Sequence, residues 1–369
     1  MGRFLLVFTL GVASLSAAFG QVQTDPVGFL QPFNSTAGQI NLLANSDTLV
    51  SIPFTRPPEF TGAIASVSGN VITVSGSPGW NVSPQQWVYA QGTQPKHYYA
   101  LIGPGTSNPK EGHMYTITGN GSNTLTVDTT SDDLSGIPAN AQVVVIPFWT
   151  LNTAFPASDA NVSFIPSPSQ FNRLTQIFIP NYSGTGINLS ATATYYFFNS
   201  AWRKFGSATS EDHGDDILVQ DGYFTVRNAG TGTVFTASGS VLTKKQTIPL
   251  LTSTSTAVDN FVSITRPVAV SLNNLGLIGS GAFATSASQF NRVDQLFVYD
   301  PTISGINKSA SATYFTTLGP DSLPHWRKFG QSVSTDFGTD TIPAGAGFVI
   351  RKGVTANGAT LYWQNAATY

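Results

Sequence analysis

The sequence predicts an all-β protein, with two related β-sandwich repeats and a small β-barrel inserted in the first. Short runs of Val, Thr, Phe, Tyr and Ile alternate with Gly, Asn, Pro and Ser, and no segment beyond residue 20 keeps a helical apolar period. Blocks from the middle of the chain return about 120 residues later. The first copy also contains a long stretch that the second copy lacks.

Four pairs of matched blocks reveal the repeat. Because they keep both their sequence and their order, the chain contains one structural unit twice. Charged and aromatic residues that recur in both copies are therefore expected to serve the scaffold. The matched blocks are residues 169–173 (SQFNR) with 288–292, 186–188 (GIN) with 305–307, 193–195 (ATY) with 312–314, and 202–206 (WRKFG) with 326–330.

The N-terminus has the layout of a secretory signal peptide. Arg3 precedes a mostly apolar run at residues 4–13, and small residues surround Phe19 before Gln21. The apolar run is too short to span a bilayer, and no later run has the length of a transmembrane helix. We therefore predict a signal peptide at residues 1–20, a secreted or cell-surface protein, and no transmembrane anchor in the mature chain.

The extra stretch in the first copy predicts a small barrel. A Thr-Arg-Pro triplet occurs at 55–57 and at 265–267, but the SQFNR block follows much later after the first triplet than after the second. The insertion carries two hairpin patterns with Gly and Asn in their turns, at residues 63–74 and 115–128. A handful of such strands can close into a barrel.

These observations predict three folded units after the leader. Within each sandwich, the alternation of apolar and charged residues at 224–227 and at 348–351 predicts strands with one apolar face. The predicted units are a first sandwich at 21–57 and 151–250, an inserted barrel at 58–150, and a second sandwich at 257–369, with a linker at 252–256.

Composition favours an uncharged partner. Charged residues make up 10% of the chain, and the net charge is −2, whereas globular proteins typically have about 25% charged residues. Weak long-range fields argue against nucleic acid as a partner. A surface with little charge also does little to keep neighbouring molecules apart. We therefore expect self-association or contact with a neutral polysaccharide. Without any cysteine, stability must come from packing and backbone pairing.

Three tryptophans are candidate ligand contacts. Trp202 and Trp326 each precede an Arg-Lys pair, and Trp80 stands in a Pro-Gly-Trp-Asn turn. An exposed indole ring can stack on the apolar face of a sugar. The alternative interpretation places these rings in the cores of the sandwiches and of the barrel.

Five charged positions recur between the repeats. In a chain so poor in charge, retention in both copies predicts structural ion pairs within or between the domains. A duplicated active site is the less favoured interpretation. The matched residues are Arg173 with Arg292, Arg203 with Arg327, Asp212 with Asp336, Asp216 with Asp340, and Arg227 with Arg351.

Motifs for catalysis and for metal binding are missing from the sequence. The acidic loop at 211–216 lacks the calcium-loop spacing, and its second copy loses three of the possible ligands. The four histidines have no zinc spacing, and no Gly-x-Ser-x-Gly elbow is present. We predict no catalysis, no cofactor and no metal, and calcium binding at 211–216 stays open.

Several blocks resemble a family of exported bacterial β proteins of unknown function. They are the Asp-Pro-Val-Gly-Phe opening at 25–29, residues 48–57, 155–159 and 182–188, and the two WRKFG blocks. The resemblance covers the whole mature chain. It implies export and the duplicated architecture, and it supplies no activity.

The sequence thus favours a secreted structural or adhesive surface protein that acts by self-association. Low-charge faces and unpaired strand edges would mediate the contact. The alternative is a carbohydrate-binding protein that uses exposed Trp residues. Exposure of the three indole rings distinguishes the two.

Overall fold

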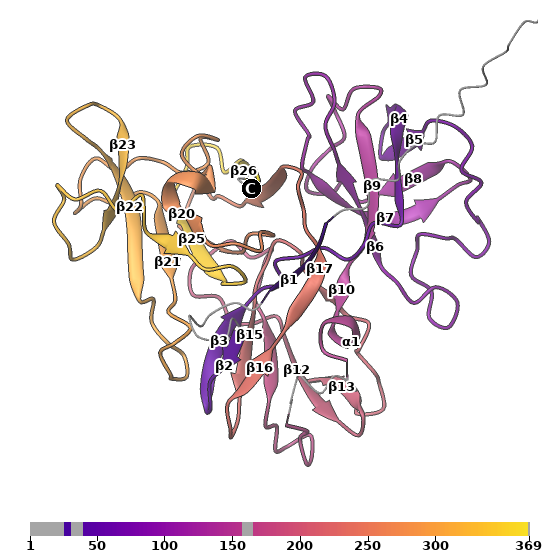
Figure 1. Ribbon diagram of the computed structural model, residues 1–369, viewed down its shortest axis with the longest axis horizontal. Helices are drawn as coiled ribbons and strands as arrows, with labels where there is room; N and C mark the ends of the chain where they lie inside the picture. The colour runs from indigo at the N-terminus through magenta and orange to yellow at the C-terminus, as the bar shows by residue number, and fades with distance from the viewer. Residues whose placement is uncertain (1–25, 31–39, 157–164, 368–369) are drawn as a thin grey trace, which may run out of the picture.

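A computed structural model describes residues 26–30, 40–156 and 165–367 of the chain. Its strands build two five-stranded sheets, one closed barrel and several two-stranded sheets. Figure 1 shows a sandwich at the bottom, the barrel at the upper right and a second sandwich at the left. The predicted all-β class with a small barrel is confirmed. The predicted signal peptide at 1–20 lies outside the described residues.

The first sandwich packs a five-stranded antiparallel sheet against small two-stranded sheets. Its core lies between these layers, where Ile177 and Val226 of the large sheet meet Leu42 and Phe235 of the small ones. The large sheet has the order β13 (Ala201–Lys204), β12 (Ala193–Phe198), β11 (Gln176–Ile179), β15 (Phe224–Asn228), β3 (Ser46–Val50). The small sheets pair β1 (Val27–Leu30) with β17 (Ala237–Ser240), β2 (Ile40–Leu42) with β16 (Thr233–Phe235), and β10 (Trp149–Thr150) with β14 (Ile217–Leu218).

The second sandwich repeats the five-stranded sheet strand for strand. Leu296 and Ile350 of its large sheet pack in one core with Ile248 and Trp363. The large sheet has the order β23 (Pro324–Lys328), β22 (Ala312–Leu318), β21 (Gln295–Val298), β25 (Phe348–Lys352), β19 (Val258–Val262). The small sheets pair β18 (Gln246–Leu250) with β26 (Leu361–Asn365) and β20 (Val270–Ser271) with β24 (Thr341–Ile342). The 3-10 turn η1 (Leu272–Leu275) follows β20, as α1 (Leu151–Ala154) follows β10.

Alternation along the strands sets which face is buried. Phe224 and Val226 in β15 point into the core, while Arg227 stays partly exposed. The corresponding residues of β25 follow the same pattern. A strand places successive side chains on opposite faces, so the predicted apolar and charged faces are confirmed.

The boundary between the sandwiches differs from the prediction. Residues 246–250 were assigned to the first sandwich, but they form β18, which pairs along its whole length with β26. Ile248 and Leu250 belong to the second core. The second sandwich therefore begins at about residue 246, and the predicted linker at 252–256 lies inside it.

The insertion forms a closed six-stranded barrel between β3 and β10. Both predicted hairpins are present in it, as β4 with β5 and as β7 with β8. Trp80 packs edge-on against Phe60 and Trp87, with ring centroids 4.8 and 5.7 Å away. The strands around the barrel are β4 (Phe60–Ser68), β5 (Val71–Val74), β8 (Thr124–Val127), β7 (Met114–Asn120), β6 (Tyr98–Ile102) and β9 (Gln142–Pro147).

Both edge strands of each five-stranded sheet make backbone hydrogen bonds to segments outside the sheet. At the outer edges, Trp202 O of β13 accepts from His213 N–H at 2.9 Å, and Trp326 O of β23 accepts from Phe337 N–H at 3.0 Å. At the inner edges, Asp47 N–H of β3 donates to Gly305 O and Asp259 N–H of β19 donates to Gly186 O, both in the other sandwich. Such bonds leave less of these edges available for pairing with another chain. The expectation that unpaired strand edges mediate self-association stays a prediction.

No helix in the described ranges has the length and apolar character that crossing a bilayer requires.

Candidate functional site

The three candidate tryptophans are core residues. Trp202 is 1% exposed, Trp326 is 0% exposed and Trp80 is 6% exposed. A strand places successive side chains on opposite faces. On β13 and β23 the ring therefore points into the sandwich and the arginine that follows it points the other way. None of the three rings presents a face to a sugar, so this prediction is corrected in favour of the core interpretation.

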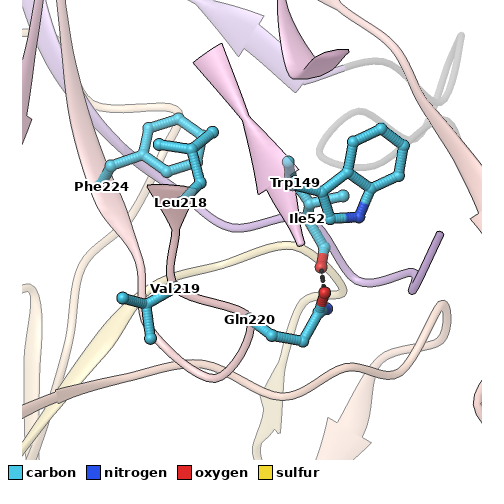
Figure 2. Close-up of a pocket in the computed structure, with 6 residues that line it drawn as sticks. All are labelled: Ile52, Trp149, Leu218, Val219, Gln220 and Phe224. Atoms are coloured by element: carbon cyan, nitrogen blue, oxygen red, sulfur yellow. Dashed lines mark hydrogen bonds between the residues drawn. The ribbon is translucent and has the colours of Figure 1, made fainter. Parts of the chain in front are cut away.

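A small pocket lies beside Trp149 in the first sandwich (Figure 2). Gln220 projects into its wall and donates from Nε2 to Phe54 O at 2.9 Å. The volume open to the centre of a water molecule is about 10 Å³, so the pocket has room for about one water. This pocket is too small for a sugar ring.

Arg227 and Arg351 make the ion pairs that the repeat predicted, with partners the sequence had not indicated. The Arg227 guanidinium holds both carboxylate oxygens of Asp47, at 2.7 and 2.8 Å. Arg351 holds Asp259 in the same fork, at 2.6 and 2.9 Å. Each pair lies directly across two neighbouring strands. The hydrogen bonds that Arg227 donates to Asp47 are the largest cause that raises the pKa of Arg227.

These two aspartates also join the sandwiches to each other. The backbone N–H of Asn307 donates to Asp47 Oδ2 at 2.8 Å, and Asp47 N–H donates to Gly305 O at 2.9 Å. The reciprocal bonds run from Asn188 N–H to Asp259 Oδ2 and from Asp259 N–H to Gly186 O, both at 2.8 Å. Each Gly-Ile-Asn block thus docks on the inner edge strand of the other sandwich.

Among the residues that the structure describes, Arg203 and Arg327 have no ion-pair partner, contrary to the prediction. Their Nη1 atoms donate to backbone carbonyls, Glu211 O at 2.7 Å and Thr335 O at 2.9 Å. Both residues are buried. These bonds tie the loop beside each outer strand to that strand.

The matched aspartates hold the same loops. Asp212 and Asp336 accept from the backbone N–H two residues later, at 2.9 Å each, and Asp336 also pairs with His325 at 2.8 Å. Asp216 and Asp340 accept the hydroxyl of a core tyrosine, Tyr195 or Tyr314, at 2.6 Å each. Burial and this bond raise the pKa of both tyrosines. Asp340 also pairs with Lys328 at 3.4 Å. Asp216 also pairs with His213 at 3.1 Å, whereas Asp212 meets no cation within the described residues, so the ion-pair prediction is wrong for Asp212.

Arg173 and Arg292 are the remaining matched pair, and they stack on rings. The Arg173 guanidinium carbon lies 4.4 Å from the centroid of Phe205, and that of Arg292 lies 4.5 Å from Phe329. Each donates from Nη1 to a backbone carbonyl three residues earlier, at 2.7 Å. Within the described residues neither meets a carboxylate. The ion-pair prediction is wrong here.

Large exposed rings accompany these arginines. Phe171 is 86% exposed and Phe290 is 87% exposed, while the stacked Phe205 and Phe329 are 62% and 61% exposed. We define the two aromatic patches as Phe171, Arg173 and Phe205 in the first sandwich, and Phe290, Arg292 and Phe329 in the second. In both, a serine hydroxyl accepts from the backbone N–H of the outermost phenylalanine at 3.3 Å and so fixes the turn.

The aromatic patches are the candidate functional site. Core residues recur in a duplicated domain because the fold needs them, but a fold does not need a ring that is almost fully exposed. Sequence reasoning used the SQFNR block as a marker of the repeat and did not recognise its phenylalanine. The available signal was an apolar residue kept in both copies inside a polar turn.

The described part of the chain holds no group of three or more His, Asp or Glu side chains arranged to bind a metal. In the acidic loop at 211–216, the Asp212 carboxylate accepts from a backbone N–H and the Asp216 carboxylate accepts from Tyr195.

A second polar cluster joins the barrel to β26, where Asp132 accepts from Tyr115 at 2.7 Å and from Tyr362 at 2.9 Å. Burial opposes ionisation there, but bonds from His113 and Lys110 as well as the tyrosines hold the pKa of Asp132 low.

No family model, no curated protein and no solved structure matches this chain.

Proposed function

We propose that this is a secreted structural or adhesive surface protein that self-associates through its two aromatic patches. The observation that carries the proposal is the near-complete exposure of Phe171 and Phe290 at equivalent positions. The partner is a second copy of the chain, whose low surface charge leaves little repulsion between neighbours. Catalysis has no part in this function.

The size of the patches predicts weak, concentration-dependent contact. Burying a phenylalanine side chain yields about 1.5–3 kcal/mol, and two facing patches would bury four such rings. Association costs an estimated 4–15 kcal/mol. The net affinity for one patch against another is therefore modest, and many copies side by side are needed for a lasting assembly.

Two patches on one chain give each molecule two neighbours. They lie beside the outer strands β13 and β23, which are well separated in Figure 1. A contact of one patch with the patch of another copy leaves a second patch free. Repeated contacts of this kind build an open filament of molecules, unless the rotation from one molecule to the next closes a ring.

The test removes both outermost rings. Phe171→Ala combined with Phe290→Ala should leave the protein folded and abolish the ordered polymers that electron microscopy is expected to show for the wild type at high concentration. The matched control is Val82→Ala, which removes an apolar side chain that is 54% exposed on the barrel. Polymers that persist in the double variant would overturn the proposal.

The alternative, a carbohydrate-binding protein, has lost its predicted contacts because Trp80, Trp202 and Trp326 are buried. A sugar would have to stack on Phe171 or Phe290 instead. A glycan array probed with the wild type and with the double variant separates the two functions. Binding to a neutral glycan that disappears in the variant would favour the sugar.

A further inference from the structure

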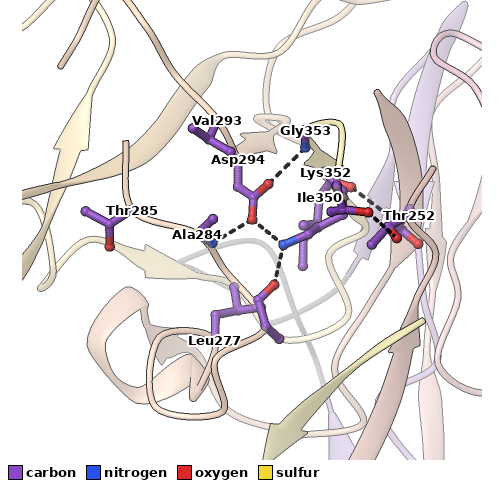
Figure 3. Close-up of polar contacts among 12 residues, drawn as sticks. Thr252, Leu277, Ala284, Thr285, Val293, Asp294, Ile350, Lys352 and Gly353 are labelled. Atoms are coloured by element: carbon purple, nitrogen blue, oxygen red, sulfur yellow. Dashed lines mark hydrogen bonds and ion pairs between the residues drawn. The ribbon is translucent and has the colours of Figure 1, made fainter. Parts of the chain in front are cut away.

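The second sandwich buries a lysine against an aspartate (Figure 3). Lys352 ends β25 and Asp294 precedes β21, and both side chains are 2% exposed. Gln295 and Arg351 face each other across these strands. The next pair along, Asp294 and Lys352, is therefore directly opposed, with Nζ in contact with Oδ2.

The backbone surrounds this pair with donors and an acceptor. Oδ2 of Asp294 accepts from Ala284 N–H at 2.6 Å, and Oδ1 accepts from Gly353 N–H at 2.9 Å. Lys352 Nζ donates to Ala282 O at 2.5 Å and lies 5.8 Å from the ring centroid of Phe283. Burial lowers the pKa of Lys352, although Asp294 opposes the shift.

The first sandwich shows that the fold does not need charge at this position. Thr175 and Asn228 occupy the equivalent strand positions, next to Gln176 and Arg227, and hydrogen bond to each other at 3.4 Å. They are as buried as the charged pair, at 2% and 1% exposed. Since burying two charges is costly and a neutral pair suffices, stability of the fold alone does not account for Lys352 and Asp294.

We propose that Lys352 and Asp294 are joined by an intramolecular isopeptide bond. A proton passes from Nζ to Oδ2, which gives a neutral amine and a carboxylic acid. Nζ then attacks Cγ, the new C–N bond forms, and the C–Oδ2 bond breaks. Oδ2 leaves as water with two protons from the original ammonium group, and one hydrogen stays on the amide nitrogen. No oxidant or further reactant is needed.

The contacts suit each stage of this reaction. Negative charge develops on Oδ1 during the attack, where Gly353 N–H already donates, as an oxyanion site requires. Direct contact holds the amine beside the carboxyl group, so the reaction is intramolecular and gains the advantage of proximity. The product is neutral, so the cost of two buried charges disappears. The bond would link neighbouring strands β21 and β25 in a chain that has no cysteine.

Mass spectrometry of a tryptic digest tests the proposal. Trypsin cuts after Arg292, Lys308 and Arg351, but it cannot cut after a lysine whose amine is acylated. The purified, folded protein should therefore yield residues 293–308 joined to residues 352–369, lighter than the sum of the two peptides by one water. Separate peptides 293–308 and 353–369 as the main products would overturn the proposal.

Two variants guard this result. Lys352→Arg keeps the charge but removes the amine, and it should abolish the joined peptide. Lys328→Arg changes a lysine that pairs with Asp340 at 3.4 Å in a partly exposed site, and it should leave the joined peptide unchanged. Because the wild-type digest decides the matter by itself, the test holds even if Lys352→Arg folds poorly.

Discussion

The two sandwiches agree at their aromatic patches and at the aspartates that dock them together, and they differ at one buried pair and at one junction residue. Both keep an exposed phenylalanine beside a stacked arginine, and both keep the aspartate that docks the other half. At one buried position, however, the first sandwich has Thr175 and Asn228 where the second has Asp294 and Lys352. The comparison separates what the fold requires from what one copy has added.

A further difference lies where the sandwiches meet. Ser51 N–H of the first donates to Gly345 O at 2.8 Å, and Ser263 N–H of the second donates to Asp221 O at 2.9 Å. The two backbone contacts are equivalent, but the accepting residue is Asp221 in one of them and Gly345, which has no side chain, in the other. Burial raises the pKa of Asp221 to about 6, so the junction contains a charge that the repeat does not need.

The largest expected effect comes from breaking the buried pair of the second sandwich. Asp294→Thr prevents the proposed bond and leaves the Lys352 amine in the core without a counter-charge, and an uncompensated buried charge should destabilise this sandwich by about 3–5 kcal/mol. Adding Lys352→Asn copies the neutral pair of the first sandwich and should recover part of the loss. Chemical denaturation followed through the transition of the second sandwich measures both. A single variant as stable as the wild type would contradict this account.

The junction offers a matched pair of variants. Asp47→Ala and Asp259→Ala each remove the partner of an arginine and the acceptor of an asparagine N–H. Each should cost about 2 kcal/mol, the usual penalty for a donor that loses its partner. Thermal unfolding of the two proteins should give similar losses. If one variant lost clearly more stability than the other, the two equivalent contacts would not contribute equally to the stability of the junction.

Asp221 predicts a pH dependence that only one repeat contributes. Its folded pKa of about 6 lies above the unfolded value of about 3.9. The contribution of Asp221 to the free energy of unfolding is therefore fully present below pH about 4, and it is lost as the pH rises through about 6. Asp221→Asn should stabilise the protein by about 2 kcal/mol at pH 7, and by almost nothing at pH 4. Equal effects at both pH values would exclude ionisation as the cause.

The smallest effect on stability is expected at the aromatic patches. Phe171→Ala and Phe290→Ala remove rings that have little contact with the fold, so each should change the free energy of unfolding by less than about 0.5 kcal/mol. Thermal unfolding of dilute protein measures this. A loss of several kcal/mol for either variant would show that the ring serves the scaffold.

The fold was largely predictable from the sequence, for identifiable reasons. The repeat of SQFNR, GIN and WRKFG blocks defined the two sandwiches, and Gly-Asn turns defined the hairpins of the barrel. The place of strand β18 in the second sandwich was not predictable, because it lies outside the matched blocks and pairs with β26, a strand far away in the sequence. The partner of Arg227 was not predictable, since Asp47 lies 180 positions away and one sequence does not give the pairing of distant strands.

The candidate site was predicted less well. Tryptophan was favoured as a contact because its ring can stack on a sugar, yet burying a large apolar ring in a core is also favourable, and all three rings are buried. Phe171 and Phe290 were passed over although they stand between polar residues in both copies. Their exposure could have been inferred from a Ser-Gln-Phe-Asn-Arg turn, in which the neighbouring residues leave no apolar strand face.

Sedimentation velocity on four proteins decides whether the matched surface rings exist for association. The proteins are the wild type, Phe171→Ala, Phe290→Ala and the double variant, each over a range of concentration. We expect the wild type to grow beyond a dimer, each single variant to stop at a dimer, and the double variant to stay monomeric. Four proteins that sediment alike at every concentration would contradict the account.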